Sequence, residues 1–330
     1  MSIVTIIFFM CRIFLHIFNQ AVITRLRLFC FKLIELNKNI VAVADAGWYF
    51  HDSFHENMLK EGYDFTDWMS VRIPHTMKET PLHYFDEQEY QKVAAYFKVL
   101  PVDKRWEGKD LLLTFEGVAH SAEVYVNGTK AAEHHCGYTA FTINLAKYVK
   151  YGADNLILVK IDSRESQNIP PFGFVIDYMT YGGIYRDVYL EVKEKAHIRD
   201  VFVNGNMRGE IRLQVSATKP ALGMTIVSEV YPVEKGGNPD AGGAGQSALG
   251  HAVFEPTGGR NKMLFYYAMK DVALWSPETP NLYLLHVMLK KEDAVLDEKW
   301  VKFGFRTAVF KPDGFYLNGR KYKIRGLNRH

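Results

Sequence analysis

Cysteine is scarce in this sequence, and the three that occur, Cys11, Cys30 and Cys136, lie far apart. An odd number of cysteines at wide spacing, with no CxxC pair and no Cys/His ligand pattern, supports neither a disulfide framework nor a zinc site. The simplest interpretation is three free thiols in a reducing compartment, which predicts a cytoplasmic location.

An excess of charge of one sign is also missing, because 40 Lys and Arg residues face 37 Asp and Glu residues, for a net charge of +3. With no basic stripe along the chain, nucleic acid is excluded as a partner. The glycine pairs between residues 234 and 260 lack the Gly-Lys-Ser/Thr ending of a phosphate-binding loop, and they favour a flexible hairpin tip. What remains is an ordinary globular composition, long enough for two or three domains.

A clean hydrophobic run of membrane-spanning length is absent. Residues 3 to 18 are strongly apolar, but Arg12 and His16 interrupt them, so the run falls short of the roughly 20 residues of a spanning helix. No Lys or Arg precedes Arg12, as a secretory signal requires. Basic residues follow, and membrane association through residues 3–34 is therefore the alternative to a cytoplasmic location. We expect residues 1–44 to be an atypical apolar and basic extension.

Segments with helical periodicity are lacking as well, and short strand-like runs separated by turn signals take their place. The pair Asn127-Gly128 is typical of a tight hairpin turn. Residues 45–195 are therefore predicted to form a jelly-roll sandwich. Nothing places His120, His134 and His135 on one face with ligand geometry, so no metal site is predicted there. The expected strands are 111–115, 122–126, 129–132 and 156–161.

Residues 196–308 read as a second all-β domain of about 110 residues, the size of an immunoglobulin-like sandwich. No residue in it calls for a catalytic role, and it is expected to act as a spacer. A further hairpin is predicted around Asn318-Gly319, between residues 315–317 and 321–324. The strands expected in the second domain are 211–215, 224–231, 262–268 and 282–289.

One connection is too long for an ordinary turn. Residues 163–183 exceed the roughly 12–15 residues beyond which loops are usually functional or disordered, and Pro170-Pro171 with several aromatic residues argues against disorder. Asp177 lies among these aromatic residues, and a carboxylate framed by rings suits a sugar. The alternative is that Asp177 caps a turn or pairs with Arg186. Gly182-Gly183 then allows a close backbone approach where the loop enters an alternating strand.

The run Tyr181-Gly182-Gly183-Ile184-Tyr185-Arg186 resembles a motif of glycoside hydrolase family 2, which contains β-galactosidases and β-glucuronidases. The resemblance extends from about residue 47 to residue 330. Its other segments are Ile73–Thr76, Phe115–Val118, Val124–Gly128, Leu274–Pro277 and Pro280–Tyr283.

The resemblance implies roles for three residues in substrate binding. Asp177 matches the family's contact to the glycone, or to a cation beside it, which would be Na⁺ or Mg²⁺ in a full-length enzyme. The ending of the sequence resembles the first strand of the family's catalytic (β/α)₈ barrel, so residues 309–330 are expected to be the truncated start of that barrel. Asn328 and His330 match barrel residues that line the glycone pocket, at the strand end where functional residues lie.

Catalysis in this family retains configuration and uses two glutamates, which hold their carboxyl groups about 5–5.5 Å apart. Both belong to later barrel strands, so no general acid and no nucleophile is assigned here, and neither Glu123 nor Asp162 is promoted to such a role. We expect an N-terminal fragment of a β-galactosidase, inactive by itself, from a parent that acts on β-galactosides and can form a homo-oligomer. The alternatives are a β-glucuronidase parent, which the Arg329 position disfavours, and a non-catalytic carbohydrate-binding scaffold.

Overall fold

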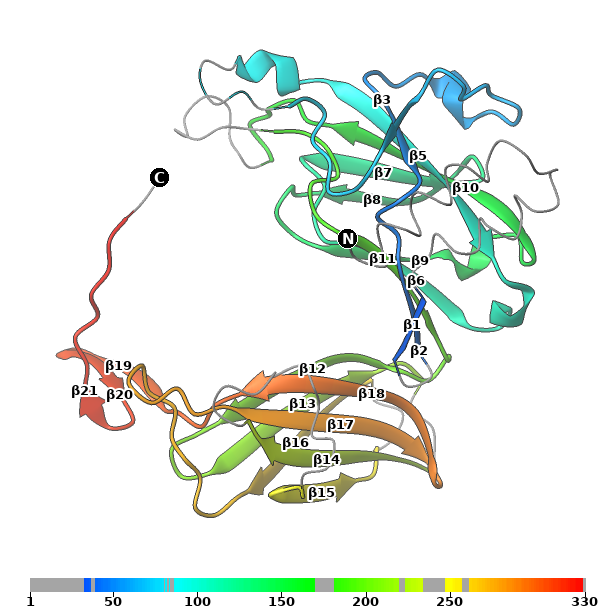
Figure 1. The fold of residues 1–330 in the computed structure, drawn as a ribbon. Helices are drawn as coiled ribbons and strands as arrows, with labels where there is room; N and C mark the ends of the chain where they lie inside the picture. The colour runs from blue at the N-terminus through cyan, green and yellow to red at the C-terminus, as the bar shows by residue number, and fades with distance from the viewer. Residues whose placement is uncertain are drawn as a thin grey trace, which may run out of the picture. The chain divides into compact units, whose positions relative to one another are not determined.

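The computed structural model shows a chain built almost entirely of strands (Figure 1). It divides into two compact units, Met1–Val192 and Lys193–His330. The described residues are 33–36, 39–79, 81, 83, 86–169, 181–219, 223–233, 247–256 and 261–328.

The first unit is a sandwich of two antiparallel sheets. The five-stranded sheet has the order β1 (Leu33–Leu36), β2 (Asn39–Val43), β11 (Val188–Lys193), β6 (Asp110–Phe115) and β9 (Phe141–Asn144). The six-stranded sheet has the order β4 (Met69–Val71), β3 (Trp48–His51), β5 (Val93–Val102), β10 (Ala153–Asp162), β7 (Ser121–Val126) and β8 (Thr129–His135). The predicted turn joins β7 to β8, with positive φ angles at Asn127 and Gly128.

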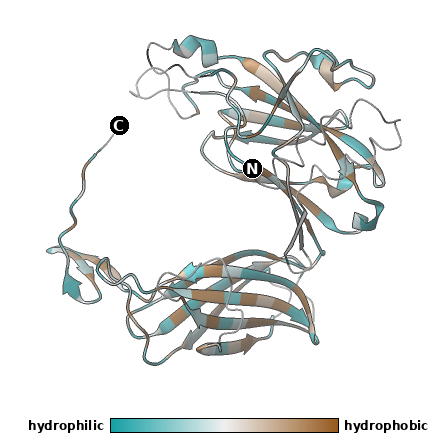
Figure 2. Cartoon of the chain, viewed as in Figure 1, coloured by the Kyte–Doolittle hydropathy of each residue, from teal (hydrophilic) through white to brown (hydrophobic). Residues whose placement is uncertain are grey.

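Alternation along the strands builds the core between these sheets, and Figure 2 shows it as bands of apolar and polar colour. In β11, Val188 and Leu190 are buried while Tyr189 and Glu191 are only partly covered, as the alternating sequence predicts. Trp48 and Phe115 meet edge to face across the core, with ring centroids 6.3 Å apart. The sandwich therefore closes on aromatic packing between its two sheets.

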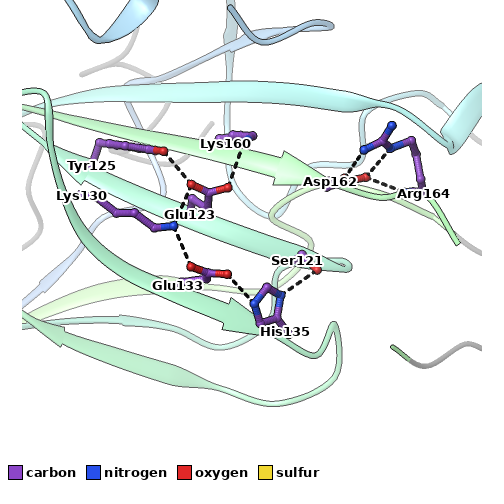
Figure 3. Close-up of polar contacts among 9 residues, drawn as sticks. All are labelled: Ser121, Glu123, Tyr125, Lys130, Glu133, His135, Lys160, Asp162 and Arg164. Carbon is purple, nitrogen blue, oxygen red and sulfur yellow. Dashed lines mark hydrogen bonds and ion pairs between the residues drawn. The ribbon is translucent and has the colours of Figure 1, made fainter. Parts of the chain in front are cut away.

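A second, smaller cluster covers part of the outer face of the six-stranded sheet. The segment 52–68, which contains the short 3₁₀ helix η2 (Glu56–Leu59), brings Met58 and Trp68 onto Phe97 and Leu158. This half of the sheet is thus buried on both faces, while the half formed by β7 and β8 carries polar side chains outward (Figure 3).

The second unit contains a sandwich of seven strands, the number expected for an immunoglobulin-like domain. Its core holds Ile211, Leu213, Leu285, Val287 and Phe305, all essentially inaccessible to solvent. One sheet has the order β12 (Ile198–Gly205), β13 (Glu210–Ala217), β16 (Lys262–Ala268). The other has the order β15 (Gly250–Phe254), β14 (Met224–Pro232), β17 (Tyr283–Lys291), β18 (Ala294–Phe303).

A small sheet follows this sandwich, made of β19 (Ala308–Lys311), β20 (Gly314–Leu317) and β21 (Arg320–Lys321). The predicted hairpin at Asn318-Gly319 is confirmed, with positive φ at both residues. Residues 322–328 form no strand. The barrel strand expected at residues 325–330 is therefore not seen in the part of the chain that the structure describes.

The all-β prediction of two sandwiches is confirmed. The first sheet nevertheless begins earlier than residue 45, because β2 pairs with β11 through Ile40 and Val192. Residues 1–32 lie outside the described residues, and with them most of the segment expected to associate with a membrane. Within the described ranges, no helix has the length and apolar character needed to cross a membrane.

Candidate functional site

The candidate site is the base of the long connection between β10 and β11. Residues 170–180, which include Asp177, lie outside the described residues, as does His330. Asn328 is described, and it is exposed to solvent. The structure therefore does not show whether these three predicted substrate contacts meet, but it does show how both ends of the Asp177 connection are fixed.

Ser163 fixes the first end. This residue is buried, and its backbone N–H donates to the carbonyl oxygen of Lys92 at 3.0 Å. Its hydroxyl donates to the carbonyl oxygens of Tyr90 and Lys92 and accepts a hydrogen bond from the Lys92 N–H at 3.2 Å. A side chain with this many backbone partners orients the chain as it leaves β10.

Gly182 and Gly183 fix the second end, between two stretches of backbone. The N–H of Met77 donates to the Gly182 carbonyl at 2.9 Å, and the N–H of Ala119 donates to the Gly183 carbonyl at 3.0 Å. One residue later, His75 donates its N–H to the carbonyl of Ile184 at 2.8 Å. Backbone bonds on both sides hold these three residues as firmly as a strand inside a sheet.

Only glycine fits at positions 182 and 183. A Cβ on Gly182 would lie 2.6 Å from the Cβ of Ser163, and a Cβ on Gly183 would lie 2.5 Å from the His75 carbonyl oxygen. Gly183 also has a φ of +128°, a conformation that residues with side chains rarely adopt. The close approach predicted for the glycine pair is thus confirmed. Since Gly182 packs on Ser163, the two ends of the connection meet.

The buried Tyr96 and the neighbouring His75 both lie next to Gly183. The Tyr96 hydroxyl is 2.8 Å from Nδ1 of His75 and accepts a hydrogen bond from the backbone N–H of Ile184. Burial raises the pKa of Tyr96 and lowers the pKa of His75, so both side chains are neutral at pH 7. A neutral imidazole has one donor and one acceptor nitrogen, so the tautomer of His75 sets which of the two groups donates in this hydrogen bond.

Beyond Gly183, two side chains tie the entry of β11 to a neighbouring turn. The Tyr185 hydroxyl donates to the carbonyl of Gly137, and the Arg186 guanidinium lies 5.1 Å from the centre of the Tyr185 ring. The same guanidinium donates to the Tyr138 carbonyl at 3.3 Å. Arg186 thus has partners of its own, whatever the position of Asp177.

A network of charged side chains crosses the outer face of β8, β7 and β10 (Figure 3). At its centre, Glu123 accepts hydrogen bonds from Tyr125 at 2.6 Å and Lys160 at 2.9 Å, and it pairs with Lys130 at 3.0 Å. Burial would raise the pKa of Glu123, but these donors outweigh it and lower the pKa to about 2. Three donors around one carboxylate make Glu123 the centre of an ion-pair network on the surface of the sheet.

The two histidines of β8, whose side chains lie on opposite faces of the sheet, also have ordinary partners. Nε2 of His134 lies 2.9 Å from the Thr139 hydroxyl, and His135 bridges Glu133 and Ser121 at 2.6 and 3.2 Å. Across the described ranges, no group of three His, Cys, Asp or Glu side chains could hold a metal ion. Asp177, the residue expected to contact a cation, lies outside the described residues.

Sequence reasoning found the connection and its glycines but missed the partners that hold them. Tyr96 and His75 are 21 positions apart in the chain, and Ser163 meets Lys92 across 71 positions. Of these partners, only His75 lies in a segment that carries the family resemblance, Ile73-Pro74-His75-Thr76.

Comparison with known proteins places this geometry in a family. Residues 52–194 match "Glycosyl hydrolases family 2, sugar binding domain", and residues 196–306 match "Glycosyl hydrolases family 2". A β-galactosidase of Thermoanaerobacter pseudethanolicus is 37% identical over 290 residues, which cover 86% of this chain and 38% of that protein. A β-glucuronidase of Bacteroides fragilis is 29% identical over 282 residues, covering 80% of this chain and 39% of that protein.

The fold is shared with solved structures. The crystal structure of a Bacteroides uniformis β-glucuronidase aligns with a TM-score of 0.72 at 23% identity, over 89% of this chain and 36% of that one. The chain therefore spans less than half the length of the relatives that it matches. With both of its sandwich domains matched along their length, the chain belongs to glycoside hydrolase family 2.

Proposed function

We propose that this chain forms the N-terminal, non-catalytic part of a retaining β-glycosidase, and that the parent enzyme is a β-galactosidase. The observation that carries the proposal is the fixed base of the Asp177 connection, where Ser163 and Gly182 meet in a passage that admits only glycine. Such a base holds a loop at a defined position against a partner domain, which an isolated binding module does not need. The 37% identity to a β-galactosidase supports the choice of parent.

In this proposal Asp177 contributes a contact to the glycone and the chain contributes no catalytic glutamate. A hydrogen bond to a charged group is worth about 1.5–3 kcal/mol, whereas association costs several kcal/mol. One carboxylate therefore cannot hold a monosaccharide on an open sandwich. The 330-residue chain alone is expected to show no galactosidase turnover and only millimolar or weaker affinity for galactose.

A chimera tests this proposal. Residues 33–330, which include β1 and β2, replace the matching segment of the Thermoanaerobacter β-galactosidase, and hydrolysis of a chromogenic galactoside is measured. Asp177→Ala is expected to lower kcat/KM by roughly ten- to a few-hundred-fold. Asp154→Ala, at an exposed position that begins β10, is the matched control and should leave the rate unchanged. If both variants have the same kcat/KM, Asp177 makes no contact to the glycone and is only a turn residue.

A β-glucuronidase parent is the second candidate, because relatives of that name also match most of this chain. The same chimera distinguishes the two when it is offered a galactoside and a glucuronide with the same leaving group. Tight galactose binding by the 330-residue chain alone would instead favour an independent carbohydrate-binding module.

A further inference from the structure

The immunoglobulin-like unit contains a small pocket that the proposed function does not use. It lies where the end of β12 meets the end of β18, two strands that also run side by side in Figure 1. Its volume is about 210 Å³, enough for one small functional group or a single sugar rather than an extended ligand. The lining residues are Val203, Asn204, Gly205, Leu282, Lys302, Phe303, Gly304 and Arg306.

The charge of this lining has one sign. Lys302 and Arg306 are cationic, Asn204 adds an amide, and no carboxylate is among the residues that line the pocket. Apolar walls from Val203 and Phe303 keep part of the pocket away from water, which strengthens the interaction of a cation with an anion. The pocket therefore favours a negatively charged guest over a neutral one.

Arg306 is held in place by a backbone hydrogen bond and by a neighbouring aromatic ring. Its backbone N–H donates to the Gly205 carbonyl at 2.9 Å, and its guanidinium lies 4.9 Å from the centre of the Trp275 ring. Among the residues that the structure describes, no carboxylate pairs with it. Lys302 has an interaction of its own, so Arg306 is the primary ligand that the pocket offers.

The floor of the pocket depends on two glycines. A Cβ at Gly205 would lie 2.7 Å from the Phe305 ring, and a Cβ at Gly304 would lie 2.9 Å from the Cβ of Trp275. The two glycines thus let Phe305 and Trp275 pack directly against the backbone that lines the pocket. Because Phe305 is fully buried, the floor is as rigid as the core beneath it.

We propose that this pocket is a binding site for a small oxyanion, either a carboxylate such as that of a uronic acid or a phosphate, with Arg306 as its principal ligand. The planar guanidinium presents a fork of donors that matches the two oxygens of either group. A cation–π contact with Trp275 uses none of the guanidinium's hydrogen-bond donors as a conventional donor, so they can serve the guest.

Calorimetry on the 330-residue chain at low ionic strength tests the site, with glucuronate, inorganic phosphate and galactose as probes. We expect glucuronate or phosphate to bind in the millimolar range and galactose, which lacks the charge, not to bind measurably. Binding of glucuronate alone identifies a carboxylate site, and binding of phosphate alone identifies a phosphate site. If neither anion binds, or galactose binds as well as glucuronate, the proposal is wrong.

Variants separate this pocket from general surface charge. Arg306→Gln should weaken anion binding roughly tenfold or more, while Arg306→Lys, which keeps the charge but loses the fork, should weaken it less. Arg199→Gln is the matched control, since it removes the same charge from β12 six residues before Gly205, about 20 Å along the strand. Equal loss in Arg199→Gln and Arg306→Gln, with both variants folded by circular dichroism, would overturn the assignment.

Discussion

Replacing Gly183 by alanine should destabilise the first unit strongly, because the new Cβ meets fixed atoms. It would lie 2.5 Å from the His75 carbonyl oxygen and 2.8 Å from the Tyr96 hydroxyl, both too close for van der Waals contact. The φ of +128° adds backbone strain. Overpacking costs about 1–3 kcal/mol and strain of this kind a further 1–2 kcal/mol, so the expected loss is about 2–5 kcal/mol. For a unit of this size that lowers Tm by roughly 5–15 °C.

Gly62 supplies the matched control for this substitution. It has a φ of +80°, yet a Cβ there would meet nothing within 4 Å. Gly62→Ala therefore carries backbone strain without a clash and should cost only about 1 kcal/mol. The difference between the two variants, measured by urea denaturation followed by circular dichroism, isolates the close approach at Gly183.

The Tyr96 hydroxyl allows a sharper form of the same experiment. Tyr96→Phe removes one of the two atoms that a Cβ at Gly183 would strike. Gly183→Ala should therefore cost less in the Tyr96→Phe background than in the native chain, because contacting residues couple. The close approach at Gly183 would be refuted by two results together. Gly183→Ala and Gly62→Ala would lower the free energy of unfolding by amounts within about 0.5 kcal/mol of each other, and the effects of Gly183→Ala and Tyr96→Phe would simply add in the double variant.

Two more predictions concern the sheets. Glu123→Gln should lower stability by about 1 kcal/mol at pH 7, after allowance for solvent screening of a partly exposed group. The pKa of Glu123 lies at about 2, below the ordinary 4.5, so its contribution is present above pH 4.5 and fades as the pH falls toward 2; a variant whose deficit is the same at pH 3 and pH 7 would contradict this. Glu107→Gln, which breaks an exposed pair with Lys104, is the control and should change little. Deleting residues 1–32 should leave the thermal transition in place, whereas deleting residues 1–43 should lower its midpoint, because β2 then no longer covers the edge of β11; equal midpoints for the two deletions would contradict the pairing.

Strands with clean alternation could be predicted from the sequence because a period of two is a local property. The run Val188, Leu190, Val192 and the turn at Asn127-Gly128 are examples, and each appears where it was expected. Strand β18 was missed because its solvent-facing positions carry charges, among them Glu298 and Lys302, that obscure the apolar pattern.

The network around Glu123 and the pair of Tyr96 with His75 could not be predicted in the same way. The residues around Glu123 come from different strands, and His75 reaches Tyr96 from the loop between β4 and β5, so only the folded chain brings these partners together. Glu123 lies opposite Lys160 in the pairing of β7 with β10, for example, across 37 positions of sequence. A glycine pair, by contrast, signals a close approach by itself but does not say which atoms come close.

The contact between Ser163 and Gly182 has a consequence for how this protein can change over evolution. Two chain ends that already touch impose no length on the segment between them, since the cost of closing a longer loop grows only slowly with its length. Insertions or deletions within residues 164–181 can therefore accumulate while Ser163, Gly182 and Gly183 keep the sandwich intact. Whole segments taken from relatives could therefore be exchanged at this junction without changing the strands on either side of it.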